Sequence, residues 1–116
     1  MKNLLLGFFL LFITINAFSQ TSNSETVLFA QSMIQVDNPE EMLALETEMR
    51  ANPYIKIVRL DYNTQRSFIL TKNLDELSED NFISWFNQYS DKVRCIQIGR
   101  HGIDAVKPFP FEGCEK

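Results

Sequence analysis

The side chains best suited to chemistry in this chain are few: two cysteines, Cys95 and Cys114, and one histidine, His101. Two thiols and an imidazole can bind a soft metal ion, but their spacing matches no zinc or copper pattern, and a tetrahedral site needs a fourth ligand. No C-x-x-C pair, the arrangement typical of a redox dithiol, occurs. In a chain that leaves the cytoplasm, the pattern favours a Cys95–Cys114 disulfide. A soft-metal site is the alternative.

Other residues that could take part in catalysis or metal binding have simpler explanations. His101 stands alone in a Gly-Arg-His-Gly loop, and general acid–base catalysis would require an orienting partner and a pocket. Met33, Met42 and Met49 could suggest a methionine-rich copper site, but two of them share an apolar stripe, which predicts core packing. No serine lies in a nucleophile-elbow context and no glycine-rich phosphate loop occurs. The sequence predicts no catalytic residue, no metal or cofactor site, and no enzyme.

The N-terminal residues have the pattern of a secretory signal peptide. Lys2 gives a short positive region, Leu4–Ile15 is a nearly unbroken apolar run, and Ala17-Phe18-Ser19 places small residues where a signal peptidase reads. The apolar run, about 12–15 residues, is shorter than the roughly 20 that span a bilayer. We predict a signal peptide over residues 1–19, a flexible polar leader over 20–25, and an exported protein, periplasmic or secreted.

Charge and length limit what the mature chain can be. Removing 19 of 116 residues leaves 97, the size of one domain. Only Lys2 is lost from the charged residues, so 15 acidic and 10 basic residues remain, a net charge of −5. Nucleic-acid and anionic-membrane partners both require clustered Lys and Arg. We therefore expect no nucleic-acid partner and no membrane association after cleavage.

The first half of the mature chain predicts a strand followed by a helix. Residues 27–36 are apolar on both faces, as in a central strand. Asn38 followed by Pro39 is typical of a helix start, and Pro53 ends the helix at the residue before it. A single apolar stripe lies between these points: Met42, Leu45 and Met49.

The second half predicts a hairpin, a helix and a strand. In Tyr54–Thr71 two β-branched runs flank polar residues 61–65, which is typical of an antiparallel hairpin. Both strands carry apolar residues on both faces, so alternation does not decide their facing. Ser78 is the predicted cap of a second helix, and residues 93–99 alternate like a half-buried last strand. Four aromatic residues recur at helical spacing between them: Phe82, Trp85, Phe86 and Tyr89.

This order of elements, βαββαβ, predicts an α+β ferredoxin-like sandwich over residues 26–102. Right-handed crossovers place both helices on one face of a four-stranded antiparallel sheet, with the first and third strands central. Residues 103–116 form a C-terminal tail, which a Cys95–Cys114 bond would tie to the last strand.

The hairpin resembles that of heavy-metal-associated (HMA-like) domains. In Ile55–Ile69 a hydrophobic strand ends in an acidic turn with a Thr before a second strand begins, and the element order matches over about Val27 to Gly99. The resemblance implies a ferredoxin-like fold. That family binds soft metal through two cysteines in the loop between the first strand and first helix, here Val36–Glu41, which contains no cysteine.

The sequence thus predicts a complete fold but no catalytic residues. The leading hypothesis is a non-catalytic, exported module that acts by binding a protein or a small ligand, at the open face of the sheet or at an edge strand. The alternative is a divergent HMA-like domain that binds or delivers metal through other ligands.

Overall fold

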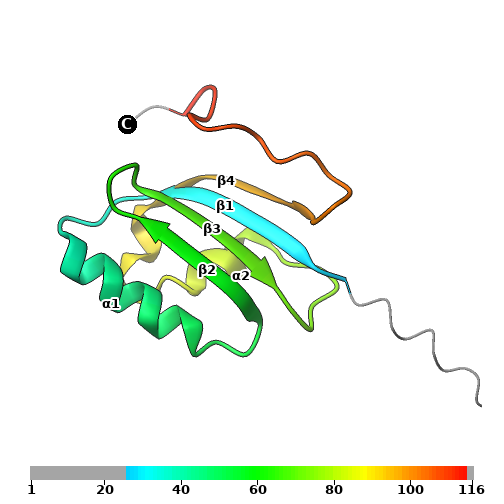
Figure 1. Cartoon of the computed structure of the whole chain (residues 1–116), viewed down its shortest axis with the longest axis horizontal. Helices are drawn as coiled ribbons and strands as arrows, with labels where there is room; N and C mark the ends of the chain where they lie inside the picture. Colours follow the sequence, from blue (N-terminus) through cyan, green and yellow to red (C-terminus); the bar gives the residue numbers. More distant parts are fainter. Residues whose placement is uncertain (1–25, 115–116) are drawn as a thin grey trace, which may run out of the picture.

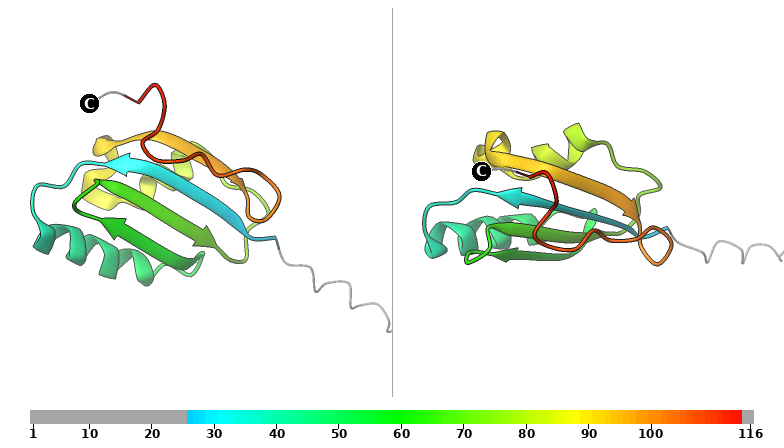
Figure 2. Two further views of the ribbon diagram at one scale, coloured as in Figure 1. Left: turned by 45° about the horizontal axis from the view of Figure 1, so that its top comes forward. Right: turned by 90° about the horizontal axis from the view of Figure 1, so that it is seen from above.

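The structure is a computed structural model that describes residues 26–114. The predicted signal peptide (1–19) and leader (20–25) lie outside the described residues. Two helices cover one face of a four-stranded antiparallel sheet, and the C-terminal tail passes over the other face (Figures 1 and 2). Within residues 26–114, no helix is both long enough and apolar enough to cross a membrane.

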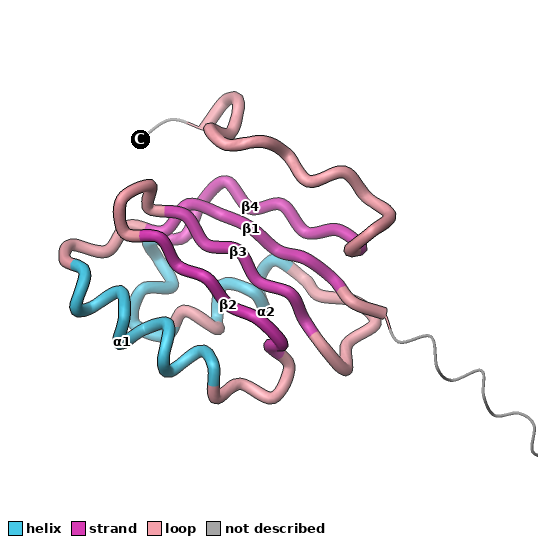
Figure 3. Tube along the Cα trace, viewed as in Figure 1, coloured by secondary structure: helices cyan, strands magenta, loops and turns pink. Residues whose placement is uncertain are grey.

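The sheet is made of β1 (Leu28–Ile34), β2 (Ile55–Asp61), β3 (Arg66–Thr71) and β4 (Val93–Arg100). The strands lie in the order β2-β3-β1-β4 (Figure 3), and every neighbouring pair is antiparallel (Figure 1). The central strands are therefore β1 and β3, and the edges are β2 and β4. This α+β arrangement is compatible with a ferredoxin-like fold.

The helix α1 (Pro39–Arg50) begins where the sequence predicts it. The Asn38 side chain accepts a hydrogen bond from the Glu41 backbone N–H at 2.8 Å, and Pro39 is the first helical residue, where its missing N–H costs nothing. The Glu41 carboxylate accepts a hydrogen bond from the Tyr89 hydroxyl at 2.7 Å. The start of α1 is thereby tied to the segment that precedes β4.

The second helix is shorter than the aromatic stripe predicts. The helix α2 (Glu79–Ser84) is followed by a 3-10 helix, η4 (Asn87–Lys92), so the prediction of one helix through Tyr89 is wrong. Asn87 has φ +54°, a left-handed conformation that ends α-helical geometry. Its side-chain amide donates a hydrogen bond to Glu48 on α1 at 2.9 Å. The break keeps Phe82 and Phe86 fully buried and leaves Trp85 and Tyr89 partly buried.

The core lies between the helices and the sheet. The methionine–leucine stripe of α1 and the buried aromatics of α2 pack in one cluster against the sheet, as expected. The buried members of this cluster are Ala30, Ile34, Val36, Met42, Leu45, Met49, Ile55, Val58, Ile69, Phe82 and Phe86. One polar pair lies in the sheet among them: the hydroxyls of Ser32 and Ser67 are 2.7 Å apart and both residues are fully buried. Each hydroxyl therefore depends on the other for a hydrogen bond.

A bulge decides the facing of β2, which alternation left open. The register between β2 and β3 shifts between Ile55 and Ile57. Ile55 and Val58 are buried in the core, whereas Ile57 is 40% exposed. Because the bulge inserts one extra residue, the alternation of side chains shifts along β2, and only one face of the strand is buried.

The face opposite the helices also has a buried part. Phe29 on β1 is fully buried, and its ring stacks on Phe68 of β3 with centroids 6.4 Å apart. Gly99 lies opposite Phe29 on β4, and a Cβ at that position would lie 2.8 Å from two atoms of the Phe29 ring. The absence of a side chain at Gly99 therefore allows the ring to lie against β4.

Candidate ligand-binding groove

Two glutamine side chains attach the C-terminal tail to the sheet by hydrogen bonds. The Gln97 side chain on β4 donates to the carbonyl of Ala105 and accepts from the N–H of Lys107, both at 2.9 Å. Gln31 on β1 is fully buried; its amide donates to Gln97 at 2.8 Å and to the carbonyl of Lys107 at 3.0 Å. The side chains thus bind the backbone polar groups of the tail, which lies over β1 and β4 (Figure 2).

The disulfide that the sequence predicts closes the far end of the tail. Cys95 and Cys114 are bonded, with Cα atoms 5.9 Å apart and a sequence separation of 19. Cys95 has φ +59° and stands where the β1–β4 register shifts between Gln31 and Met33. The bond is compatible with an oxidising compartment, and it leaves neither sulfur as a thiolate for the soft-metal alternative.

Between these anchors the tail places two aromatic rings over the sheet. The guanidinium carbon of Arg66 on β3 lies 4.7 Å from the centroid of the Phe109 ring and 5.8 Å from that of Phe111. The two rings meet edge to face with centroids 5.8 Å apart. Phe111 is buried and Phe109 is 38% exposed. A cation stacked on aromatic faces is a favourable contact that holds both partners in place.

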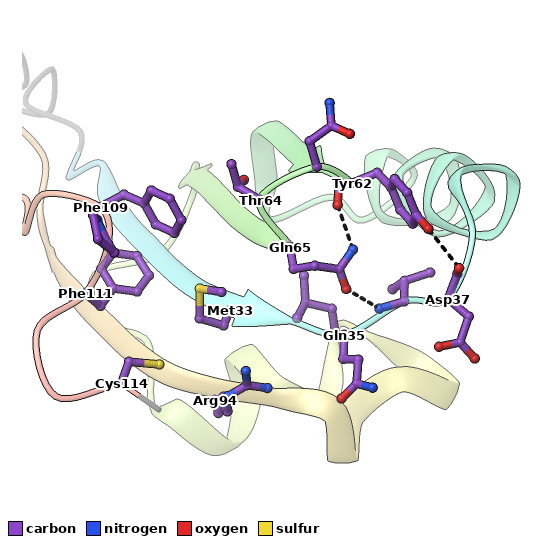
Figure 4. Close-up of a pocket in the computed structure, with 14 residues that line it drawn as sticks. Met33, Gln35, Asp37, Tyr62, Thr64, Gln65, Arg94, Phe109, Phe111 and Cys114 are labelled. Atoms are coloured by element: carbon purple, nitrogen blue, oxygen red, sulfur yellow. Dashed lines mark hydrogen bonds between the residues drawn. The ribbon is translucent and has the colours of Figure 1, made fainter. Parts of the chain in front are cut away.

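A groove of about 990 Å³ lies between the tail and the turn that joins β2 to β3 (Figure 4). Met33 and Arg94 line it from the sheet, Tyr62 from the turn, and Phe109 and Phe111 from the tail. The remaining lining residues are Ile34, Gln35, Val36, Asp37, Asn63, Thr64, Gln65, Pro110 and Cys114. The groove is therefore an open site with aromatic and sulfur-containing walls and few charges.

Gln65 holds the turn side of the groove in place. Its side-chain carbonyl accepts from the N–H of Val36, and its amide donates to the carbonyl of Tyr62, both at 2.8 Å (Figure 4). The Tyr62 hydroxyl donates to the carbonyl of Asp37 at 2.9 Å. Gln65 itself has φ +58°, and its carbonyl accepts from the N–H of Ile34. These bonds fix the turn to the loop between β1 and α1, which forms the end wall.

Among residues 26–114, the one clear pKa perturbation lies outside the groove. The hydrogen bond to Glu41 raises the pKa of Tyr89 above its ordinary value of 10.0, with smaller contributions from desolvation and from nearby carboxylates. This hydrogen bond joins α1 to η4 and belongs to the framework that holds the helices together.

The structure separates the residues that the sequence singled out. His101 is exposed in the turn after β4, and its backbone N–H donates to the carbonyl of Val27. Met42 and Met49 are buried in the core, whereas Met33 lines the groove. Among residues 26–114, no three His, Cys, Asp or Glu side chains are grouped so that they could hold a metal ion.

The two surfaces where a partner was expected to bind, the open face of the sheet and an edge strand, are each partly covered. The sheet face away from the helices is open only in part, because the tail covers β1 and β4. At the β2 edge the N–H of Leu60 donates to the Glu46 carboxylate of α1 at 3.0 Å, so this edge is blunted at that point.

Sequence reasoning missed the residues that build the groove. Gln31 and Gln97 are polar residues at mid-strand positions, and Phe109 and Phe111 are aromatics spaced by prolines in a tail expected to be only tied back. Large apolar rings outside a regular element are a signal of a second packing surface. That signal was available in the sequence.

Comparisons with known proteins add no assignment. A scan against protein-family models gave no matching family, and searches of the curated proteins and of the solved structures gave no match.

Proposed function

We propose that the protein is an exported, non-catalytic module that binds a small ligand in the groove between the tail and the β2–β3 turn. The observation that carries this proposal is the construction of the tail. Side chains on β1, β3 and β4 and a disulfide hold it over the sheet, and the result is a walled groove.

The size and lining of the groove support a small ligand. Ligand sites are typically concave, about 300–1,000 Å³, and mainly apolar with a few placed polar groups. The groove has that volume, and its lining is mixed: Met33, Phe109 and Phe111 are apolar contacts, the turn contributes polar side chains, and Arg94 and Asp37 are the charged groups. The walls are fixed by hydrogen bonds within the chain, so little ordering is required on binding.

The β2 edge is poorly suited to a peptide that adds a strand, which favours a small ligand in the groove over that mode of binding. Strand addition needs an edge with free backbone groups. On β2 the N–H of Leu60 already bonds to Glu46. Export is supported by the disulfide, which persists in an oxidising compartment, together with the signal-peptide pattern of residues 1–19.

The test is a screen of neutral fragments by amide chemical-shift mapping. The protein is expressed from its complete sequence into an oxidising compartment, so that processing and the disulfide are retained. We expect shifts concentrated at residues 33–37, 62–65 and 109–114. Gln35→Trp places a large ring at an exposed position of the groove wall and should abolish these shifts, whereas Lys56→Trp, exposed on β2 outside the groove, should not. Shifts clustered on another face, or unaffected by Gln35→Trp, would contradict the proposal.

A further inference from the structure

One row of side chains crosses all four strands at the groove end of the sheet. Met33 on β1 is paired with Arg66 on β3 and with Arg94 on β4, and Arg66 is paired with Asp61 on β2. Residues directly opposite in a sheet point to the same face, here the face covered by the tail. Two arginines therefore flank one methionine, with Cα atoms roughly 10 Å apart, two strand spacings.

Neither arginine has an anionic partner among the described residues. The ion pairs within residues 26–114 join Arg50 to Glu46 and Arg100 to Asp104. The Nε atoms of Arg66 and Arg94 are buried without a hydrogen-bond partner. A buried guanidinium N–H without an acceptor is unfavourable and requires an explanation. Arg94 lines the groove, and Arg66 contacts Phe109 and Phe111, two residues of the groove wall. The position of Arg94 suggests that its missing anionic partner is a ligand.

The nearest carboxylates on this face are engaged elsewhere or exposed. The Asp61 carboxylate accepts hydrogen bonds from the N–H of Asn63 and from the hydroxyl of Thr64, at 3.2 and 2.7 Å, and so belongs to the turn. Asp37 is exposed and lies on the far wall, where its backbone carbonyl binds the Tyr62 hydroxyl (Figure 4). Arg94 is left to act on what enters the groove, while Arg66 contacts two residues of the groove wall.

Arg66 is already held in place for such a role. The contacts of its guanidinium with Phe109 and Phe111, which both line the groove, hold it against the groove wall. Arg94 lines the groove directly, beside Met33 and Phe111. An anion at Arg94 would thus sit next to apolar surface, within the field of a second fixed cation.

We infer that the groove takes a small organic carboxylate. Arg94 binds the carboxylate through its guanidinium, which matches the planar geometry of that group, and Arg66 adds positive potential from β3, two strands away. The aromatic or aliphatic body of the ligand packs on Met33, Phe109 and Phe111. An inorganic anion would bind the arginine but leave the apolar walls exposed to water. An organic acid therefore fits the lining better. This inference rests on the proposed function, since it names the ligand class of the same groove.

The experiment compares 3-phenylpropanoate, its neutral amide 3-phenylpropanamide, and sulfate by chemical-shift titration of the disulfide-bonded protein. We expect the acid to bind at the groove at least tenfold more tightly than the amide, and sulfate more weakly than the acid. Arg94→Gln should bring acid and amide within twofold of each other, and Arg94→Lys should keep part of the preference. Arg66→Gln should reduce the preference severalfold. Arg100→Gln, whose guanidinium pairs with Asp104 outside the groove, should leave it unchanged.

The outcomes separate the inference from the proposed function. If the amide binds the groove as tightly as the acid in the unmodified protein, the carboxylate assignment is wrong and the groove remains a binding site. If sulfate binds as tightly as the acid, the organic part of the assignment is wrong. If the acid preference survives in Arg94→Gln, the role of Arg94 is wrong. If neither 3-phenylpropanoate nor its amide shifts the groove amides, the proposal that the groove binds a small ligand is contradicted as well.

Discussion

Removing the disulfide is the perturbation whose effect can be worked out most fully from the structure. Cys95 and Cys114 are separated by 19 residues. On the chain-entropy account, opening a loop of that length frees the unfolded chain and costs about 3 kcal/mol at 25 °C. Because a domain of this size has a total stability of about 5–15 kcal/mol, the loss is a large share. At about 4–8 °C per kcal/mol, the melting temperature should fall by about 12–24 °C.

The assay is guanidinium chloride unfolding followed by the fluorescence of Trp85, the single tryptophan. Three samples are compared: oxidised protein, the same protein with reductant, and a Cys95→Ala, Cys114→Ala double variant. The reduced protein and the double variant should coincide, each about 3 kcal/mol less stable than the oxidised protein. Reductant should not affect the double variant. A loss below about 1 kcal/mol would show that the tail is not part of the cooperative fold, which would refute the view that it forms a fixed wall of the groove.

Three further predictions test the packing around the sheet. Gly99→Ala should cost about 1–3 kcal/mol in urea unfolding, because the new Cβ would lie 2.8 Å from a buried phenylalanine ring. Ser67→Ala should cost about 1–3 kcal/mol by leaving the Ser32 hydroxyl unpaired, whereas the double change Ser32→Ala, Ser67→Ala should cost less than the two single losses together. In an ultraviolet titration Tyr89 should ionise above its ordinary pKa of 10.0, because the hydrogen bond to Glu41 raises its pKa, and Tyr89→Phe should remove that titration step. The stability that this raised pKa contributes is present below pH 10 and is lost as the pH rises through the raised pKa.

Local signals in the sequence predicted the elements whose ends and faces depend on residues close together in the chain. Asn38 and Pro39 start α1 as expected, because capping depends on two or three adjacent residues. The hairpin and the apolar stripe of α1 also follow from short-range patterns, and the α+β arrangement follows from the order of elements. The disulfide was predicted because the signal-peptide pattern places the two cysteines in an oxidising compartment.

The features that sequence patterns missed depend on long-range contacts. The aromatic stripe through Tyr89 has perfect helical spacing, yet Asn87 turns to a left-handed conformation and bonds to Glu48, a residue 39 positions away. The facing of β2 is set by a bulge against β3, which no periodicity encodes. The groove depends on the tail folding back over β1 and β4, and Gln31 reaches Lys107 across 76 residues. Such pairings become visible only once the strands are assembled.

The central claim is that a small organic acid occupies the groove between the tail and the β2–β3 turn. Intermolecular nuclear Overhauser effects from bound 3-phenylpropanoate test it most directly. The account predicts contacts from the ring protons of the probe to the Met33 methyl group and to the rings of Phe109 and Phe111. Contacts instead to Ile57 and Leu70, on the part of the sheet face that the tail leaves open, would contradict it.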